Sequence, residues 1–294
     1  MKIAVIAVLY NQKLTAGNTW NTLLRPVLHR AQIILADNSD DRQLREENRK
    51  AAETCGAVYI DMEENRGLSA AYNRAIGVIA GGTDSRNEDR AGGKTEETDS
   101  AEKYGSRDEW IVTADQDTCF PENYLQILEE TAGQTKCDVL VPVVRAGQKQ
   151  LSPCRRKGAR FVPYEQEKLS EKELQEAFFI NTGLAFRKSI FEDPSVRYEE
   201  KLFLDFADFD FINRLRTEKK VRFGLLPHVV LQQEFSGTEA RTAEQDLERF
   251  RHFAGDGRLF YERWYDKKTA ERAVRIRALR LAAKHHDTRF LKKI

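Results

Sequence analysis

The sequence predicts an α/β fold in which a mostly parallel central sheet is flanked by helices. Apolar, β-branched runs recur in the first 114 residues and have the composition of strands buried on both faces. Helix-like segments separate these runs, and strands that alternate with helices usually pair in parallel. The strands are predicted at residues 3–9, 32–36, 57–60 and 110–114, and the helices at 19–28, 42–55 and 68–79.

The rest of the chain continues the pattern with less regular spacing. Ser170 is an N-cap candidate for a short helix, and acidic residues near 208 suit the first turn of another. The predicted elements are a helix at 123–131, a strand at 139–144, a polar loop to about 164, a helix at 170–177, an extended segment at 178–186, a helix from about 208 to 215, strands at 221–226 and 229–232, and helices over 238–294.

Composition indicates a globular protein, with 294 residues of which 40% are hydrophobic and 32% charged. No apolar run is long enough to span a bilayer, and the apolar start lacks a cleavage region, so it is predicted to be a strand and not a signal peptide. The cysteines show no paired spacing, which favours reduced thiols, a cytoplasmic location and no assigned role; they are Cys55, Cys119, Cys137 and Cys154.

Charge is unevenly distributed along the chain. A net charge of +1 predicts no nucleic-acid partner, but residues 262–294 contain eleven Lys or Arg against four Asp or Glu. This basic tail suggests peripheral contact with an anionic membrane surface. An aromatic cluster precedes it, for which packing on the main body and interfacial docking both stay open: Phe260, Tyr261, Trp264 and Tyr265. Residues 81–108 are rich in polar residues and Gly and are predicted to be a mobile surface insertion.

Asp115 and Asp117 follow a predicted buried strand, one residue apart. Two neighbouring carboxylates suit a hard divalent cation that also binds phosphate oxygens. The alternative is that they only form a turn or cap a helix. Asp37 follows another strand, where an acid can bind a ribose or base. Gly67 precedes a helix whose N-terminus favours phosphate, and no dinucleotide-binding or P-loop glycine motif is found.

The order of these motifs resembles the inverting family-two glycosyltransferases of GT-A fold, and within them the rhamnosyltransferase-like group. The resemblance covers roughly residues 2–237. It rests on Val8-Leu9-Tyr10-Asn11, Ile34-Leu35-Ala36-Asp37-Asn38-Ser39, Asn65-Arg66-Gly67 with Ala70-Ala71-Tyr72-Asn73, Ala114-Asp115-Gln116-Asp117-Thr118, Ile180-Asn181-Thr182-Gly183, and Asp208-Phe209-Asp210 ahead of Arg214.

The resemblance implies a catalytic domain at 1–237, with a nucleotide-binding half to about 120 and an acceptor half after it, followed by a helical basic extension at 238–294. Its donor would be a dTDP- or UDP-sugar, its acceptor a glycan or lipid-linked oligosaccharide of a bacterial surface polysaccharide, and its cofactor Mn²⁺ or Mg²⁺. Metal binding would fall to Asp117 and Asp115. The implied nucleotide-sugar contacts are Leu9, Tyr10, Asn11, Asp37, Asn38, Asn65, Gly67, Asn73, Asp115 and Gln116, and the sugar or acceptor contacts are Asn181, Thr182, Gly183, Asp205 and Asp210.

Asp208 falls where this family keeps its general base. Inverting transfer by single displacement needs one acid cluster with a cation at the leaving diphosphate and a separate carboxylate that takes the acceptor proton. On a helix that starts near Asp208, Asp208 and Asp210 point about 200° apart, so a single base is expected. The alternative is an acidic helix start favoured by the helix dipole.

One departure from the family concerns Gln233, which stands where many relatives carry a metal-binding His. Gln is a poor ligand for transition metals, so a nucleotide-sugar-binding protein that has lost catalysis is a second hypothesis. His228 lies five positions earlier and is predicted to be structural. A sugar nucleotidyltransferase is a third hypothesis, but it would need a Gly-rich basic loop after the first strand, which is absent there.

Overall fold

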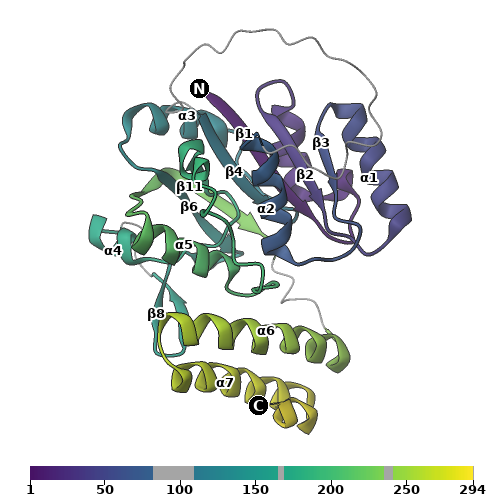
Figure 1. Cartoon of the computed structure of the whole chain (residues 1–294), viewed down its shortest axis with the longest axis vertical. Coiled ribbons are helices and arrows are strands. Elements are labelled where there is room, and N and C mark those ends of the chain that lie inside the picture. The colour runs from purple at the N-terminus through teal and green to yellow at the C-terminus, as the bar shows by residue number, and fades with distance from the viewer. Residues whose placement is uncertain (82–108, 165–168, 235–240, 294) are drawn as a thin grey trace.

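The computed structural model describes residues 1–81, 109–164, 169–234 and 241–293. Apart from Gly81, the insertion predicted at 81–108 lies outside these residues. Figure 1 shows a central sheet covered by helices, with two long helices below it. In the described residues the main sheet has the order β3 (Val58–Asp61), β2 (Gln32–Asp37), β1 (Lys2–Leu9), β4 (Glu109–Asp115), β10 (Ala185–Arg187), β6 (Val139–Ala146), β11 (Phe223–Gln233) and β5 (Thr118–Cys119), with β7 (Lys149–Ser152) on β6.

The first half of the sheet is parallel, as predicted. β1 pairs with β2 on one side and β4 on the other, so that Leu9 lies beside Asp37 and Val8 beside Asp115. Alternate residues of β1 enter two cores, because successive side chains point to opposite faces. Ile6 packs with α2 (Leu68–Ile79), and Val5 with the segment near Trp20. The sheet is therefore buried on both faces, which accounts for its uninterrupted apolar strands.

The helices begin and end where short-range signals place them. Asp41 accepts the N–H groups of Gln43 and Leu44 and caps α1 (Arg42–Cys55), which ends at left-handed Gly56. Ser170 forms a capping box with Glu173 at α4 (Glu171–Glu176). The remaining α-helices are α3 (Tyr124–Gln134), α5 (Ala207–Glu218), α6 (Ala243–Trp264) and α7 (Lys267–His285).

Three predicted elements differ in the structure. The helix expected at 19–28 is a π-helix, η2 (Trp20–Leu24), followed by a 3-10 turn, η3 (Arg25–Val27), because Pro26 has no N–H to continue an α-helix. The loop expected up to residue 164 contains β7 and a hairpin of β8 (Cys154–Lys157) and β9 (Arg160–Pro163). The two late strands form one, β11, whose register shifts between Leu225 and Val230. The late part of the sheet is mixed, since β10 runs antiparallel to both β4 and β6.

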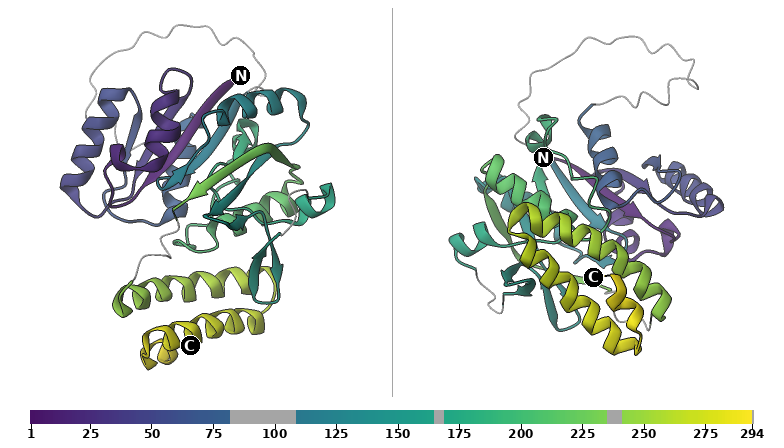
Figure 2. Two further views of the ribbon diagram at one scale, coloured as in Figure 1. Left: turned by 180° about the vertical axis from the view of Figure 1, so that it is seen from behind. Right: turned by 60° about the horizontal axis from the view of Figure 1, so that its bottom comes forward.

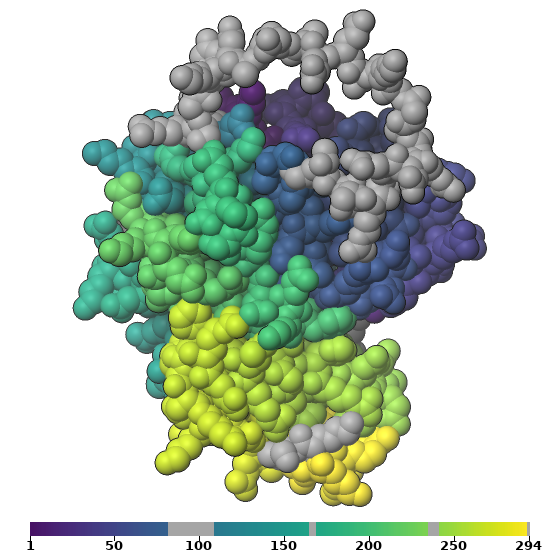
Figure 3. All heavy atoms as spheres, viewed as in Figure 1, coloured from purple at the N-terminus to yellow at the C-terminus, as the bar shows by residue number. Residues whose placement is uncertain are grey.

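The C-terminal helices pack against the main body through aromatic residues. α6 lies between the sheet domain and α7, as both views in Figure 2 show. Phe260 and Tyr261 are buried and join Phe206 in one cluster, which confirms the packing alternative for these aromatics. In the space-filling view of Figure 3 the yellow α6 and α7 are in close contact with the segment before α5. Among the described residues, no helix has the length and apolar character needed to cross a membrane.

Candidate functional site

The ends of three neighbouring strands bring the predicted donor-side residues together. β2, β1 and β4 are adjacent and parallel, so the residues that follow them emerge at one edge of the sheet. Tyr10 and Gln116 join two of these ends by reciprocal bonds: the Tyr10 N–H donates to Gln116 Oε1 at 2.8 Å, and Gln116 Nε2 donates to the Tyr10 carbonyl at 3.1 Å. Tyr10 is exposed and donates its hydroxyl proton to Asp40 at 2.9 Å. An open polar rim results.

Asn11 continues this rim in a left-handed conformation, with φ of 47°. Its N–H donates to Ser39 Oγ at 2.8 Å, and its side-chain oxygen accepts the Asp40 N–H at 3.0 Å. Left-handed backbone at a residue other than Gly is uncommon and is best tolerated by Asn. The loops after β1 and β2 are therefore held against each other by Asn11.

Asp37 lies beneath the rim and not on it. It is fully buried, and its carboxylate accepts hydrogen bonds from Asn48 Nδ2 at 2.8 Å, Tyr59 Oη at 2.9 Å and the Ser39 N–H at 3.0 Å. This carboxylate orders the loop after β2. Its setting differs from the predicted ribose or base contact, because the protein itself already uses both oxygens.

Asn38 and Asn65 connect the donor-side loops. Asn38 donates to Asn65 Oδ1 at 2.8 Å and accepts the Arg66 N–H at 2.8 Å. Gly67 has φ of 88°, and a Cβ there would lie 2.7 Å from the Phe203 carbonyl oxygen. Gly67 therefore permits a close approach to the Phe203 backbone. The ligand contact predicted for Gly67 stays a prediction.

Asn73 also has a structural partner. Its Oδ1 accepts the Tyr198 N–H at 2.7 Å, and its Nδ2 donates to the Tyr198 carbonyl at 3.0 Å and to Glu200 at 2.9 Å. α2 thus holds the segment around Tyr198. The amide of Asn73 is occupied by that segment, and the nucleotide-sugar contact predicted for Asn73 stays a prediction.

Asp115 and Asp117 form an acidic pair with Gln233. Gln233 Nε2 donates to Asp115 Oδ2 at 3.2 Å and lies 3.4 Å from Asp117 Oδ1, while Tyr72 Oη donates to Asp115 Oδ1 at 3.2 Å. Gln233 reaches them because it pairs with Thr118 across β11 and β5. Burial and the charge of Asp117 raise the pKa of Asp115 to about 7, and burial raises the pKa of Asp117.

This pair fits a divalent cation in its chemistry. No basic side chain lowers the pKa of either carboxylate in the part of the chain that the structure describes, so a cation would supply the missing opposite charge. The same residues include no cluster of three or more His, Cys, Asp or Glu with metal-binding geometry. A cation held by these two carboxylates would keep its other coordination positions for diphosphate oxygens and water, as is usual for Mg²⁺ in proteins.

The segment 181–183 contacts the end of β4, next to the acidic pair. Thr182 Oγ1 accepts the Asp115 N–H at 3.2 Å and shares a 2.8 Å hydrogen bond with Thr118. Gly183 has φ of 76°, and a Cβ there would lie 2.2 Å from Leu231. Asn181 is buried and accepts the Tyr198 hydroxyl proton at 2.9 Å. Thr182 therefore helps to position Asp115, and the sugar contacts predicted for these three residues stay a prediction.

Asp208 forms a second acidic centre, in the first turn of α5. Burial raises the pKa of Asp208 to about 7, and the charge of Asp115 adds to the shift. Tyr72 and Tyr198 stack at 5.2 Å, and the charges of Asp115 and Asp208 act on both rings, whose pKa values are raised mainly by burial. The charges of both acidic centres therefore act on the same pair of stacked tyrosines.

Asp210 and Asp205 have protein partners. Asp210 is fully buried and accepts hydrogen bonds from Trp264 Nε1 at 2.8 Å, Arg263 at 3.0 Å and Arg214 at 3.0 Å. It joins α5 to α6, so the sugar contact predicted for Asp210 is replaced by a structural role. Asp205 forms a two-point ion pair with Arg249 of α6. Among the described residues no arginine pairs with Asp208, which accepts the Phe209 N–H at 2.8 Å. That Asp208 acts as the single base stays a prediction.

Sequence reasoning missed several residues that shape this site. Tyr72 was part of a quoted motif, and its four-residue spacing from Leu68 and Ile76 already places it on the buried face of α2. Tyr198, Arg249 and Asp256 gave no such signal, because their partners lie far away in the chain.

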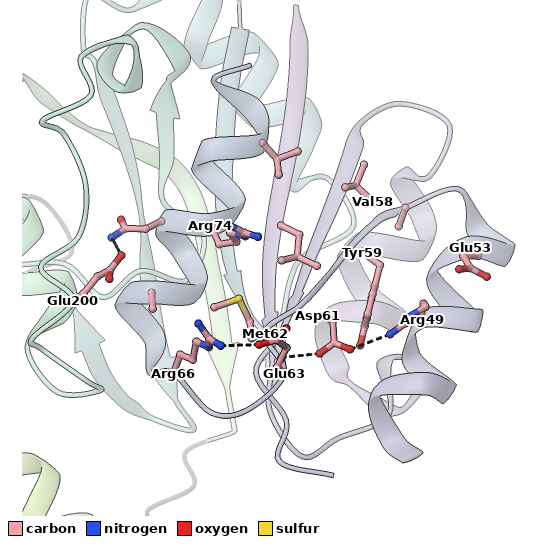
Figure 4. Close-up of a pocket in the computed structure, with 15 residues that line it drawn as sticks. Arg49, Glu53, Val58, Tyr59, Asp61, Met62, Glu63, Arg66, Arg74 and Glu200 are labelled. Carbon is pink, nitrogen blue, oxygen red and sulfur yellow. Dashed lines mark hydrogen bonds and ion pairs between the residues drawn. The ribbon is translucent and has the colours of Figure 1, made fainter. Parts of the chain in front are cut away.

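A second hollow lies at the outer edge of β3, away from the strand-end site. Figure 4 shows Arg49, Tyr59 and Asp61 on one side of it and Arg66 and Arg74 on the other. Its volume is about 970 Å³. Of the predicted site residues in the described chain, Asn73 lines it, whereas Asp115, Asp117 and Asp208 do not. This hollow is therefore separate from the two acidic centres.

Comparisons with known proteins agree with this architecture. Residues 93–193, about a third of the chain, match the family model described as Glycosyl transferase family 2. A comparison with curated proteins finds no match. A mannosyltransferase from Pyrobaculum calidifontis, solved with GDP-Man and Mn²⁺, superposes with a TM-score of 0.53 at 13% identity, covering 96% of this chain and 75% of that one.

The other similar structures are of S. aureus TarS. The complex of TarS 1–349 with UDP-GlcNAc has a TM-score of 0.50 at 14% identity, covering 88% of this chain and 67% of that one. The chain spans 66% of the related UDP complex, about two thirds of its length. At this identity the likeness concerns the fold. The protein therefore has a GT-A fold, and its residues 93–193 carry a match to the glycosyl transferase family 2 domain.

Proposed function

We propose that this protein is an inverting glycosyltransferase that moves a sugar from a nucleoside diphosphate to a hydroxyl group of a glycan or lipid-linked acceptor. The observation that carries the proposal is the pair of opposed acidic centres. Asp115 and Asp117 lie at the sheet edge, Asp208 lies at the start of α5, and both centres border the stacked Tyr72 and Tyr198. A single displacement requires this separation of leaving-group and nucleophile sides.

On the donor side, the acidic pair would hold Mn²⁺ or Mg²⁺ between itself and the diphosphate. The cation supplies charge stabilisation to the departing nucleoside diphosphate. Asp117 is the more direct ligand in this proposal, since Asp115 already accepts hydrogen bonds from Tyr72 and Gln233. Leu9, Tyr10, Asn11 and Gln116 would line the slot for the nucleoside, with a dTDP- or UDP-sugar as the expected donor.

On the acceptor side, Asp208 would take the proton of the attacking hydroxyl. A base works best when its pKa lies near the operating pH, and burial raises the pKa of Asp208 to about 7. Asp205 and Asp210 are paired with arginines and would not take part in the proton transfer. Asp37, Asn38, Asn65, Gly67, Asn73, Asn181, Thr182 and Gly183 would hold the loops of the site.

The proposal is tested with a panel of nucleotide-sugars, including dTDP-rhamnose and UDP-hexoses, assayed with and without Mn²⁺ against glycan acceptors. We expect one base to be preferred, and the anomeric carbon of the product to be inverted by NMR. A retained anomeric configuration would contradict the proposed single displacement. Glu218→Gln, at the exposed far end of α5, is the matched control and should transfer at the wild-type rate.

A second candidate follows from Gln233. Its amide N–H group points at both carboxylates of the acidic pair and occupies the place of a metal-binding His. A protein that binds the donor without transferring or hydrolysing it would account for this. Isothermal titration that detects donor binding, together with no product over the full acceptor panel, would favour this candidate.

The cellular setting is also part of the proposal. Lys268, Arg272 and Arg275 are exposed at spacings of four and three residues and share one face of α7 with exposed Leu279. Such a face suits an anionic lipid surface, where a lipid-linked acceptor of surface-polysaccharide synthesis would be found. Sedimentation with phosphatidylglycerol vesicles should fall to the level of neutral vesicles in K268E/R272E/R275E. Equal sedimentation with both vesicle types in wild type would exclude this part of the proposal.

A further inference from the structure

The segment that leads into Asp208 is held from two sides by parts of the chain distant in sequence. On one side lies the start of α2. The Leu68 N–H donates to the Phe203 carbonyl at 2.7 Å, and Ser69 Oγ donates to the Leu202 carbonyl at 2.7 Å. Gly67 leaves room for this contact, because any Cβ there would overlap the Phe203 backbone. The nucleotide-side half of the fold thus fixes the carbonyl groups of residues 202 and 203.

On the other side lies Asp256, in the middle of α6. Its Oδ1 accepts the Phe203 N–H at 3.1 Å, and its Oδ2 accepts the N–H groups of Leu204 and Asp205, both at 2.8 Å. Asp256 is 4% exposed, so these three bonds are shielded from water. Bonds from N–H donors to a carboxylate are charge-assisted and stronger than bonds between neutral groups.

Phe206 connects this held segment to the helix of the base. It adopts a left-handed conformation with φ of 62°, which is strained for a bulky residue and persists only where the surroundings enforce it. Its ring stacks on Phe260 of α6 at 5.0 Å, and its carbonyl accepts the Asp210 N–H at 2.8 Å in the first turn of α5. α6 therefore holds both the backbone before Phe206 and its ring, one residue away from the start of α5.

We propose that Asp256 is a positioning residue for transfer: by holding the N–H groups of residues 203–205 it sets the direction from which Asp208 enters the site. This inference rests on the proposed function, in which Asp208 is the base. If Asp256 has this role, α6 contributes to the position of the catalytic base and does more than pack against the main domain.

The test compares Asp256→Ala and Asp256→Asn in the full chain. Asn keeps one acceptor oxygen for the two shorter bonds and loses the third, whereas Ala loses all three. Because a misplacement of about 1 Å can lower a rate by about 100-fold, we expect kcat to fall about 100-fold for Ala and about tenfold for Asn. The donor KM should change by less than about twofold, since the strand-end slot lies on the other half of the fold.

Asp246→Asn is the matched control. Asp246 is also a buried carboxylate of α6, at 7% exposure, but it accepts hydrogen bonds from Lys284 and His285 of α7, both at 2.7 Å, and does not touch residues 203–205. It should weaken the α6–α7 contact and leave kcat unchanged. A kcat loss in Asp246→Asn as large as that in Asp256→Asn would show a general effect of α6 stability and overturn the proposal.

Hydrogen exchange separates this inference from the proposed function. The amides of Phe203, Leu204 and Asp205 should exchange slowly in wild type and in Asp246→Asn. The Phe203 amide should exchange fast in Asp256→Asn, and all three amides should exchange fast in Asp256→Ala. Fast exchange of the Phe203 amide with an undiminished kcat would overturn the positioning role, and so would slow exchange of that amide in Asp256→Asn. If wild type transfers no sugar from any donor, the proposed function fails, whereas the exchange pattern still decides whether Asp256 holds the segment. Should Asp256→Ala not fold, Asp256→Asn carries the comparison alone.

Discussion

The acidic pair and Asp208 are held in place in opposite ways. Asp115 ends β4, inside a run of parallel pairing with β1, so its position follows from a regular register. Asp208 follows an irregular segment whose backbone is held by α2 and by α6, a helix nearly 50 residues further along the chain. One centre is built by local repetition and the other by distant contacts.

This difference has an energetic consequence. A strand end in the centre of a sheet moves little, because many backbone bonds would have to break together. The approach to Asp208 depends on a few side chains, above all Asp256 and Phe206, and is easier to displace. Substitutions on the acceptor side should therefore change the catalytic rate, while those at the strand ends should change metal and donor binding.

The largest expected effect comes from removing each centre in turn. Asp208→Asn should lower kcat by about 1,000-fold, since loss of a general base removes 10²–10⁴-fold of rate, and should leave donor binding intact. Asp117→Asn should abolish the Mn²⁺-dependent part of donor binding instead. Both are measured by transfer kinetics and by calorimetric titration of the donor. If Asp208→Asn lost donor binding to the same extent, the two sides would not be separable.

Asp208→Asn, which should lower kcat, should increase the free energy of unfolding at high pH. The folded-state pKa of Asp208 is raised from 3.8 to about 7, so its contribution to stability is complete below pH 3.8 and is lost as the pH rises through 7. Asn avoids the buried charge. At pH 8 we expect Asp208→Asn to be more stable by about 1–3 kcal/mol, and at pH 4 by about zero. Urea unfolding at the two pH values measures this, and equal midpoints at pH 8 would argue against a buried charge.

The same pKa predicts the pH profile of transfer. The base must be a carboxylate, so kcat/KM should fall about tenfold per pH unit below about pH 7 and level off above it. The measurement runs from pH 5 to 9 at saturating Mn²⁺. The residual activity of Asp208→Asn should lack this acid limb. A wild-type profile that stays flat to pH 5 would exclude Asp208 as the group that titrates.

The smallest effect is expected at the metal side. Gln233→His would place an imidazole where the amide now donates to Asp115 and Asp117, and should tighten Mn²⁺ binding about tenfold. Gln232→His is the control, because the neighbouring residue of β11 points to the other face of the sheet. Manganese titration of donor binding measures both. An unchanged affinity in Gln233→His would place the cation elsewhere.

Local pattern predicted the parts of this protein that local physics controls. The apolar runs located β1, β2, β3 and β4, and the boundaries of α2 were predicted to the residue. Because the carboxyl ends of parallel strands share one edge of a sheet, Tyr10, Asp37 and Asp115 were predicted to lie near one another, and the strand register confirms this. The same reasoning missed β7, β8 and β9, because each strand has only four residues and none carries an alternating apolar pattern.

The sequence by itself determined the sheet type, the acidic pair and the place of Asp208 at the start of its helix, since these depend on spacing of a few residues. Only the tertiary structure decided which side chains are free to act. In the folded protein, Asp37 and Asp210 are buried among hydrogen-bond donors. Gly67 lies against the Phe203 backbone, and Asp256 binds the backbone N–H groups of the segment that precedes Asp208. Such pairings join residues up to 136 positions apart, as for Gly67 and Phe203, and no periodicity along the chain encodes them.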